Sequence, residues 1–355
     1  MSPTPSTVIR LQILLAAGLT AVLTSTAVAP AAAATTTGTP ASTAASGTVA
    51  KPDAHGAVAD SGAVPAAAAS TALRGTDSTR GAGSPGGAGN GKAGPGGLRS
   101  DAGFARTPDN RTSPGIQSVI GTDNRVRVNP TTVYPSSAIV QIVRTTNGST
   151  WGCTGWLYGP SIIATAGHCV HPGGGANGGG GNGFYPRGDF QIIPGRNGAA
   201  TPYGTCTATQ LLSVTNWTQS GDETNDYGAI RLSCAAGNTT GWFGLWWQSA
   251  TLTGTATTVS GYPCDKPFGE QWRHAGQTVQ VTHDRQVFYQ NDTFGCQSGS
   301  PVYQTRAAGS AFCTGQCVMA IHAYGVHGSA PHSTNNHGTR ITESVFNNLI
   351  TWRNS

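Results

Sequence analysis

Three residues of the chain have the types and the order needed for nucleophilic catalysis by a serine. His168 lies in the stretch 165–169, Asp226 begins the stretch 226–230, and Ser298 lies in the glycine-rich stretch 295–301. A serine hydroxyl is a weak nucleophile at neutral pH, so an imidazole must take its proton and a buried carboxylate must hold that imidazole in one tautomer. Together the three side chains predict acyl transfer through a covalent serine intermediate.

The order of these residues also indicates a fold. His before Asp before Ser is typical of the chymotrypsin-like double β-barrel, whereas subtilisin-like enzymes run Asp, His, Ser and α/β-hydrolases run Ser, acid, His. Taken singly, each residue also fits an ordinary structural role, as a core histidine, a turn aspartate or a turn serine. We select Asp226 because it directly precedes an apolar strand expected at 229–232. The other aspartates between His168 and Ser298 are Asp189, Asp222, Asp265, Asp284 and Asp292.

Short apolar and β-branched runs between turn clusters predict an all-β region that would position these residues. One set of runs covers 138–143, 155–158, 161–164, 190–193, 209–214 and 229–232. A second set covers 255–261, 271–275, 277–282, 287–289, 301–304 and 317–323. We therefore expect a chymotrypsin-like double antiparallel β-barrel, with barrel one at about 118–240 and barrel two at about 241–340. A C-terminal α-helix is expected at 342–354, where Thr342 can cap and apolar residues recur at helical spacing.

The first third of the chain has a different composition. Residues 1–34 combine Arg10, an apolar stretch at 11–29 and small residues at 32–34, the pattern of a signal peptide. Residues 35–117 are dominated by Ala, Gly, Thr, Ser and Pro, with too few large apolar side chains for a packed core. We interpret 35–117 as a low-complexity propeptide, with a disordered linker as the alternative, and 118–355 as the serine protease domain. A secreted, extracellular protein is expected.

Charge and composition limit the classes of molecule that the protein is expected to bind. The formal net charge is +5, but lysines and arginines are few and scattered, without the basic cluster that nucleic acid requires. The glycine-rich stretch 172–183 lacks the GK[ST] ending and the following helix of a phosphate-binding loop, which indicates a surface insertion beside His168. We expect a monomer that acts on protein and peptide substrates, needs no cofactor, and has no membrane contact once the signal peptide is removed.

The glycines around Ser298 suggest how a developing negative charge would be bound. They allow the chain to turn tightly enough to aim backbone amides at the oxyanion of the transition state. The expected donors are the amides of Cys296 and Ser298. A cysteine at 296 is unusual, because a glycine is expected there.

The region from 118 onward resembles the bacterial glutamyl endopeptidases, the V8-like branch of the chymotrypsin superfamily. The resemblance runs over essentially this whole region and rests on SVIGTD at 118–123, CTGW at 153–156, ATAGHC at 164–169, PGRNG at 194–198, DYGAI at 226–230, SGYP at 260–263, QSGSPV at 297–302 and GTRIT at 338–342. It implies a mature start at or near Ser118, a two-barrel fold, and His168, Asp226 and Ser298 as the catalytic triad.

The same resemblance implies cleavage after glutamate, and less readily after aspartate. His322 matches the family's strand that lines the primary specificity pocket, where an imidazole can compensate a buried carboxylate. Thr293 and the new amine of Ser118 are further substrate-binding candidates. Asp292 lies six residues before Ser298, where trypsin-like enzymes carry the aspartate that attracts Arg and Lys. Similar glutamyl endopeptidases also carry Asp-Thr at this place, so His322 is favoured over Asp292.

The resemblance implies two disulfides, Cys153–Cys169 and Cys313–Cys317. Cys264 and Cys296 each replace a glycine of the family pattern, which makes them plausible partners and leaves Cys206 with Cys234; the pairing of these four stays open. All eight cysteines lie between Cys153 and Cys317, which fits an oxidising compartment. A metal site is the alternative for Cys313 and Cys317, but their glycine-rich context and that compartment argue against zinc, and no metal is expected. The histidines considered with them are His322, His327, His332 and His337.

Two rival functions remain. The first keeps the enzyme but gives it trypsin-like basic specificity through Asp292. The second is a protease-like binding protein with impaired catalysis, a hypothesis motivated by the unusual Cys296 and opposed by the intact triad.

Overall fold

The computed structural model describes residues 57–60, 62–63, 118–310 and 313–355. The expected signal peptide and most of the expected propeptide therefore lie outside the described residues. No helix in the described part of the chain is both long and apolar enough to cross a membrane.

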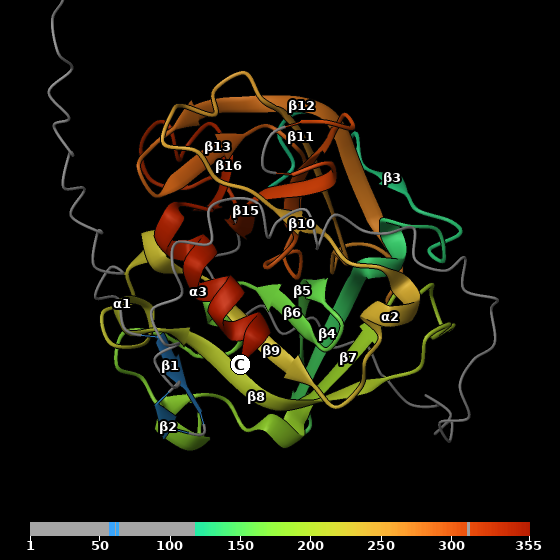
Figure 1. Ribbon diagram of the computed structural model, residues 1–355, viewed down its shortest axis with the longest axis vertical. Helices are drawn as coiled ribbons and strands as arrows, with labels where there is room; N and C mark the ends of the chain where they lie inside the picture. The colour runs from blue at the N-terminus through green and yellow to red at the C-terminus, as the bar shows by residue number, and fades with distance from the viewer. Residues whose placement is uncertain (1–56, 61, 64–117, 311–312) are drawn as a thin grey trace, which may run out of the picture. The chain divides into compact units, whose positions relative to one another are not determined.

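Two six-stranded barrels form most of the described chain, one from the green and yellow strands and one from the orange and red strands of Figure 1. In the first barrel the hydrogen-bonded order is β8-β7-β4-β5-β6-β9, and pairing of β8 with β9 closes it. Its strands are β4 (Ile139–Thr146), β5 (Ser149–Gly159), β6 (Ile162–Thr165), β7 (Phe190–Pro194), β8 (Cys206–Val214) and β9 (Gly228–Leu232).

The order in the second barrel is β15-β14-β11-β12-β13-β16, closed by pairing of β15 with β16. Its strands are β11 (Ala256–Gly261), β12 (Trp272–Thr282), β13 (Gln286–Tyr289), β14 (Pro301–Arg306), β15 (Gly315–Tyr324) and β16 (Asn336–Arg340).

These strands confirm the all-β, chymotrypsin-like double barrel. Alternating apolar side chains point into each barrel, where residues such as Ile142, Leu157 and Ile230 are fully buried. The expected runs 271–275 and 277–282 form one strand, β12, because Gly276 adopts a positive φ and makes a bulge instead of a turn.

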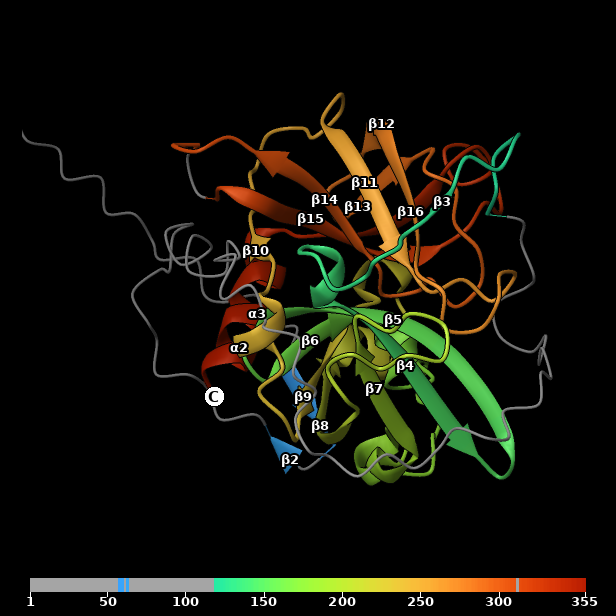
Figure 2. The same ribbon diagram turned by 90° about the vertical axis from the view of Figure 1, so that its right-hand side faces the viewer.

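Short elements surround the barrels. The brief helices are α1 (Thr215–Thr218) and α2 (Gly237–Thr240). Strand β10 (Gly244–Leu245) pairs parallel with β15, and β3 (Val126–Arg127) pairs with β12, so the start of the 118–355 region lies along the second barrel (Figure 2).

The C-terminal helix α3 (Glu343–Asn354) confirms the expected helix and its cap, since Thr342 accepts a hydrogen bond from the amide of Val345. Its apolar face packs into the core of the first barrel, where the rings of Trp352 and Tyr227 lie 5.8 Å apart. The hydroxyl of Tyr227, the residue after Asp226, accepts a 2.7 Å hydrogen bond from Asn348 of this helix. The helix thus supports the backbone that carries Asp226.

A strand within the low-complexity leader was not expected from the sequence. Strand β1 (Ala57–Ala59) pairs antiparallel with residues 212–214 of β8, and β2 (Gly62–Ala63) pairs with β1. Ala59 is fully buried, and the carboxylate of Asp60 lies 2.9 Å from the guanidinium of Arg187. The glycine-rich insertion contributes too, because Asn182 donates a hydrogen bond to the carbonyl of Ala59.

Candidate active site

His168 and Asp226 meet where two paired strands of the first barrel end. His168 lies in the 3₁₀ turn Gly167–Cys169 directly after β6, and Asp226 directly precedes the Tyr227–Gly228 step into β9, whose residue Gly228 pairs with Thr165. The Nδ1 atom of His168 lies 2.7 Å from Oδ2 of Asp226, and the His168 amide donates to Oδ1 at 2.8 Å. Asp226 is fully buried, so the imidazole is held by both its ring and its backbone.

Gly167 makes this approach possible. A Cβ atom at this position would lie 2.9 Å from Oδ1 of Asp226 and 2.8 Å from the ring of Trp217. The glycine therefore permits the carboxylate to come within hydrogen-bonding distance of the next residue's amide.

The electrostatics of the pair affect the acidity of the imidazole. Burial by itself would lower the pKa of His168, but the charge and hydrogen bond of Asp226 outweigh burial and raise that pKa above its ordinary value of 6.5. An imidazole in this environment is a stronger base than a free histidine.

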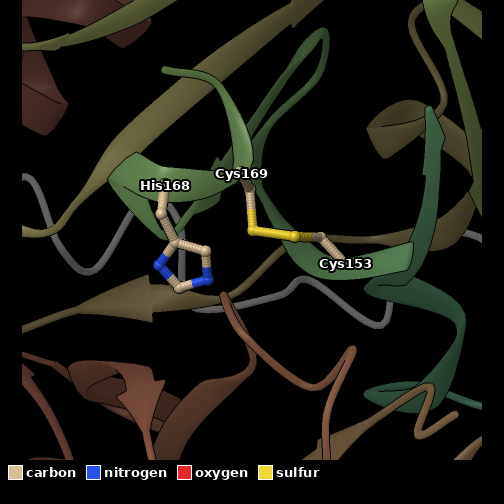
Figure 3. A group of neighbouring side chains, drawn as sticks. All are labelled: Cys153, His168 and Cys169. Carbon is tan, nitrogen blue, oxygen red and sulfur yellow. A yellow bond between two sulfur atoms is a disulfide. The ribbon is translucent and has the colours of Figure 1, made fainter. Parts of the chain in front are cut away.

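A disulfide fixes the turn that carries His168. Figure 3 shows the bond between Cys153 of β5 and Cys169 beside the imidazole of His168. Because both sulfurs are in the disulfide, they cannot serve as thiolate metal ligands, although these cysteines and His168 lie close together. The bond joins β5 to the turn after β6.

Ser298 lies against the same turn. Its carbonyl accepts a 2.9 Å hydrogen bond from the amide of Thr154 and lies 3.7 Å from the sulfur of Cys169. The hydroxyl of Ser298 is half-buried and points to the carbonyl of Ala323, 3.5 Å away. The structure thus places Ser298 beside the turn that carries His168, with the Ser298 side chain turned toward β15.

The turn before Ser298 has the conformation that a glycine would favour. Cys296 has φ = 74°, and its disulfide to Cys264 connects this turn to the segment after β11. The carbonyl of Gly295 accepts from the Cys264 amide at 2.9 Å, so this peptide directs its N–H away from Cys264. Within the described residues, the amides of Cys296 and Ser298 make no hydrogen bond. These two donors are available to a substrate.

The substrate-binding candidates lie in the second barrel. His322 of β15 is buried, and its Nδ1 lies 2.7 Å from the hydroxyl of Tyr289 on β13. Burial lowers the pKa of His322 to about 3 and raises the pKa of Tyr289 well above its ordinary value, so both side chains are uncharged at neutral pH. Thr293 is fully buried, and its hydroxyl has no hydrogen-bond partner in the described part of the chain.

The start of the expected mature domain is attached beside Thr293. The carbonyl of Ser118 accepts hydrogen bonds from the Thr293 amide at 3.1 Å and from Asn336 at 2.5 Å. Asp292 holds the residues that follow, since its carboxylate accepts from the amides of Ile120 at 2.9 Å and Asn124 at 2.8 Å. The carboxylate that could attract a basic substrate is therefore bound to the chain's own backbone.

All eight cysteines form disulfides. The pairs Cys153–Cys169 and Cys313–Cys317 agree with those implied by the resemblance, and the other two pairs are Cys206–Cys234 and Cys264–Cys296. No free cysteine is present between 118 and 355 where the structure describes the chain. Cys313 and Cys317 therefore have no free thiols with which to form the alternative metal site.

Two tyrosines that contact the site were not predicted from the sequence. The hydroxyl of Tyr289 contacts His322, and the ring of Tyr324 lies 5.9 Å from that of His168. Tyr324 lies two residues after His322, a signal that could have identified it, but nothing in the spacing of Tyr289 connects it with β15.

Comparisons with known proteins agree with this arrangement. The family model for trypsin matches residues 126–350. A glutamyl endopeptidase of Bacillus licheniformis is 43% identical over 240 residues, which cover 68% of this chain and 70% of that protein. An extracellular metalloprotease of Bacillus subtilis is 41% identical over 240 residues, covering 67% of this chain and 70% of that protein.

A solved structure of a Glu endopeptidase in complex with MPD aligns with a TM-score of 0.54 and 26% identity, over 67% of this chain and 100% of that chain. The sequence match and the double barrel lead to the same assignment. The chain belongs to the trypsin family and is a serine protease of the chymotrypsin-like fold.

Proposed function

We propose that the protein is a secreted serine endopeptidase that hydrolyses peptide bonds after glutamate, and less readily after aspartate. Ser298 is the nucleophile, His168 the general base and acid, and Asp226 the group that orients His168. The observation that carries the proposal is the double contact of Asp226 with the ring and the amide of His168, near a serine whose own amide and that of Cys296 are available.

The catalytic cycle follows from these positions. When a substrate binds, the hydroxyl of Ser298 turns from the Ala323 carbonyl toward Nε2 of His168, gives up its proton and attacks the carbonyl carbon. The amides of Cys296 and Ser298 stabilise the oxyanion. His168 then donates the proton to the leaving amine, and a water molecule, deprotonated by His168, releases the acyl group from Ser298.

Selectivity for glutamate is attributed to donors in the second barrel. Tyr289 has a hydroxyl proton and is placed to donate it to Nδ1 of His322, which leaves Nε2–H of His322 as a donor. A substrate carboxylate buried without donors would be strongly destabilised, so an imidazole N–H and the Thr293 hydroxyl favour glutamate over apolar side chains. Cleavage before Ser118 would add a positively charged amine near Thr293.

Secretion is supported by two observations. Four disulfides are typical of proteins that mature in an oxidising compartment. The relative from Bacillus subtilis is also described as extracellular. We further propose that residues 35–117 keep the precursor inactive until cleavage before Ser118; full activity of the uncut chain would contradict this.

The test is hydrolysis of matched peptides that differ only in Glu, Asp, Arg or Phe before the scissile bond. The mature form is compared with Ser298→Ala and with Ser300→Ala. Ser300→Ala is a matched control, because it removes a neighbouring hydroxyl that has no hydrogen-bond partner among the described residues. We expect cleavage after Glu in the wild type and in Ser300→Ala, and none in Ser298→Ala.

Each other outcome identifies a rival. A preference for Arg would assign specificity to Asp292. Absence of cleavage of every peptide, together with failure of Ser298 to react with a sulfonyl fluoride, would favour the binding protein in which Cys296 has impaired the oxyanion site.

A further inference from the structure

Three histidines converge on one carboxylate outside the candidate catalytic group. Their Nε2 atoms lie 2.5 Å (His337), 3.3 Å (His327) and 3.9 Å (His332) from Oε1 of Glu223. The imidazole rings are mutually close, with centroids 4.8 to 5.2 Å apart. We call these four residues the three-histidine cluster.

The cluster joins the two barrels. Glu223 begins the 3₁₀ turn Glu223–Asn225, which precedes Asp226 and β9 of the first barrel. His337 is on β16 of the second barrel, and the other two histidines lie in the loop between β15 and β16. A backbone hydrogen bond of 3.0 Å from the His327 amide to the His332 carbonyl holds the two loop histidines on the same side.

The residues of the cluster differ in burial: His337 is fully buried, and the other three are partly exposed. The His337 side chain is fully buried and stacks between the rings of Phe288 and Tyr324, at 5.1 and 5.3 Å. The side chains of His327, His332 and Glu223 are 29%, 27% and 33% exposed, so part of each side chain borders solvent. The position of His337 is fixed by the stacked rings, and the loop histidines form the side of the cluster that faces solvent.

A hydrogen-bond network accounts for only part of this arrangement. His337 and Gln286, the latter at 3.2 Å, are hydrogen-bonded to Oε1 of Glu223. Nε2 of His327 is buried and faces the same oxygen but makes no hydrogen bond in the described structure. Three protonated imidazoles at this spacing would repel one another, so one carboxylate does not explain why all three Nε2 atoms face it. A shared cation would explain this.

The distances match the size of a tetrahedral site. Zinc binds imidazole nitrogen and carboxylate oxygen at about 2.0–2.2 Å, which places neighbouring ligand atoms roughly 3.3–3.5 Å apart. The ligand atoms of Glu223, His327 and His337 lie within 4.8 Å of one another, and the 3.3 Å separation of His327 from Glu223 falls in that range. Nε2 of His332, 3.9 Å from Glu223, would have to move closer as a metal binds. The 2.5 Å contact of His337 would have to open by about 1 Å as a metal replaces the shared proton.

The donor types identify the class of ion. Three imidazole nitrogens and one carboxylate oxygen suit Zn²⁺ and similar first-row divalent ions, whereas Ca²⁺ and Mg²⁺ prefer all-oxygen sites. Four protein ligands also fill a tetrahedron, which is typical of structural zinc and leaves no open position for catalysis.

We propose that Glu223, His327, His332 and His337 bind one zinc-type divalent ion. The ion ties the loop between β15 and β16 to the turn that leads into Asp226. The loop begins after Ala323 and Tyr324, which contact Ser298 and His168, so the bound ion steadies one wall of the active site. The site does not depend on the proposed cleavage after glutamate.

The test measures zinc binding to Ser298→Ala protein, which avoids self-digestion, produced without a histidine tag. After removal of metal by a chelator, equilibrium dialysis should restore about one zinc ion per chain. Zinc should also raise the unfolding temperature of the metal-free protein, whereas Ca²⁺ at the same concentration should not. Cobalt should give the visible absorption of a tetrahedral Co²⁺ site.

Variants show whether the histidines supply the ligands. His327→Ala and His332→Ala, each added to Ser298→Ala, should weaken zinc binding at least about tenfold and abolish the cobalt spectrum. His283→Ala is the matched control, because His283 contacts Phe288 but is exposed and is not among the residues that face Glu223. Zinc binding equal in all variants, or none in the parent protein, would overturn the proposal.

Discussion

At the scale of single residues, the hydrogen bonds of Asp226 make His168 a better base and also restrict the pH range in which it can act. As the proposed general base, His168 must be neutral to accept a proton from Ser298, and its pKa is raised above 6.5. The value of kcat/KM for a Glu peptide should therefore fall as the pH decreases through a point above 6.5. A pH profile of the wild type measures this point, and an acid limb below 6.5 would contradict it.

Asp226→Asn should change both the size and the pH dependence of the activity. Loss of the charge removes the favourable interaction with the imidazolium and releases the tautomer, so kcat should drop by about 10⁴-fold. Any residual activity should have its acid limb at lower pH than the wild type, because burial then acts on His168 without a compensating charge. An unchanged limb would assign the orienting role to another group.

The hydroxyl of Tyr289 should influence selectivity more than general activity. Tyr289→Phe removes one hydrogen bond to His322, and loss of about 1.4 kcal/mol corresponds to a tenfold lower kcat/KM for Glu peptides. Tyr158→Phe is the control, because the buried hydroxyl of Tyr158 has no hydrogen-bond partner in the described part of the chain. Equal losses for Glu and Phe peptides would show that Tyr289 acts through stability alone.

Motifs could predict His168, Asp226 and Ser298 because each lies within a short stretch of characteristic residues. The contacts of Tyr289 and Glu223 could not be predicted in this way. Tyr289 reaches β15 across β16, and Glu223 meets histidines about 100 residues later in the other barrel. Such contacts depend on strand order and register, which local spacing does not encode.

At the scale of elements, the Cys264–Cys296 disulfide attaches the turn before Ser298 to the segment that follows β11. Replacing both cysteines by glycine should lower the free energy of unfolding by about 3–4 kcal/mol for the 32-residue separation. The kcat should remain within about tenfold of the wild type, since glycine readily adopts the φ of 74° found at 296.

Replacing both cysteines by alanine provides the comparison. This variant lacks the same disulfide but must place a Cβ atom at positive φ, which costs roughly 1 kcal/mol more and favours a different turn. Urea unfolding and kcat of the two double variants measure the difference. Equal kcat values would show that backbone conformation at 296 does not limit oxyanion binding.

Elements with strong apolar patterns were predicted well, and polar ones were not. The runs at 138–143 and 229–232 became β4 and β9, because nearly continuous apolar stretches need a buried barrel strand. Strand β16 contains Asn336, His337 and Gly338, which do not favour strands, and yet it is completely buried. Tertiary pairing with β13 and β15 overrides its weak local preference.

At the scale of the whole molecule, Asp292 anchors residues 120–124 to the second barrel. Asp292→Ala leaves the amides of Ile120 and Asn124 without their acceptor, which should lower the free energy of unfolding by about 2–4 kcal/mol. Asp292→Asn, which keeps one carbonyl acceptor, should lose less. Both variants should still prefer Glu peptides; a wild-type preference for Arg that disappears in them would place Asp292 in the specificity pocket instead.

Strand β1, which lies in the expected propeptide, covers an edge of the first barrel. Residues 212–214 of β8 are paired by β1, and Ala59 is buried there. An enzyme that has lost its leader would present this short backbone edge to other chains, and bare edges promote strand-to-strand association. The segment that contains β1 would then protect the enzyme from aggregation. The colloidal stability of a processed enzyme would depend on whether the cleaved segment stays bound to β8.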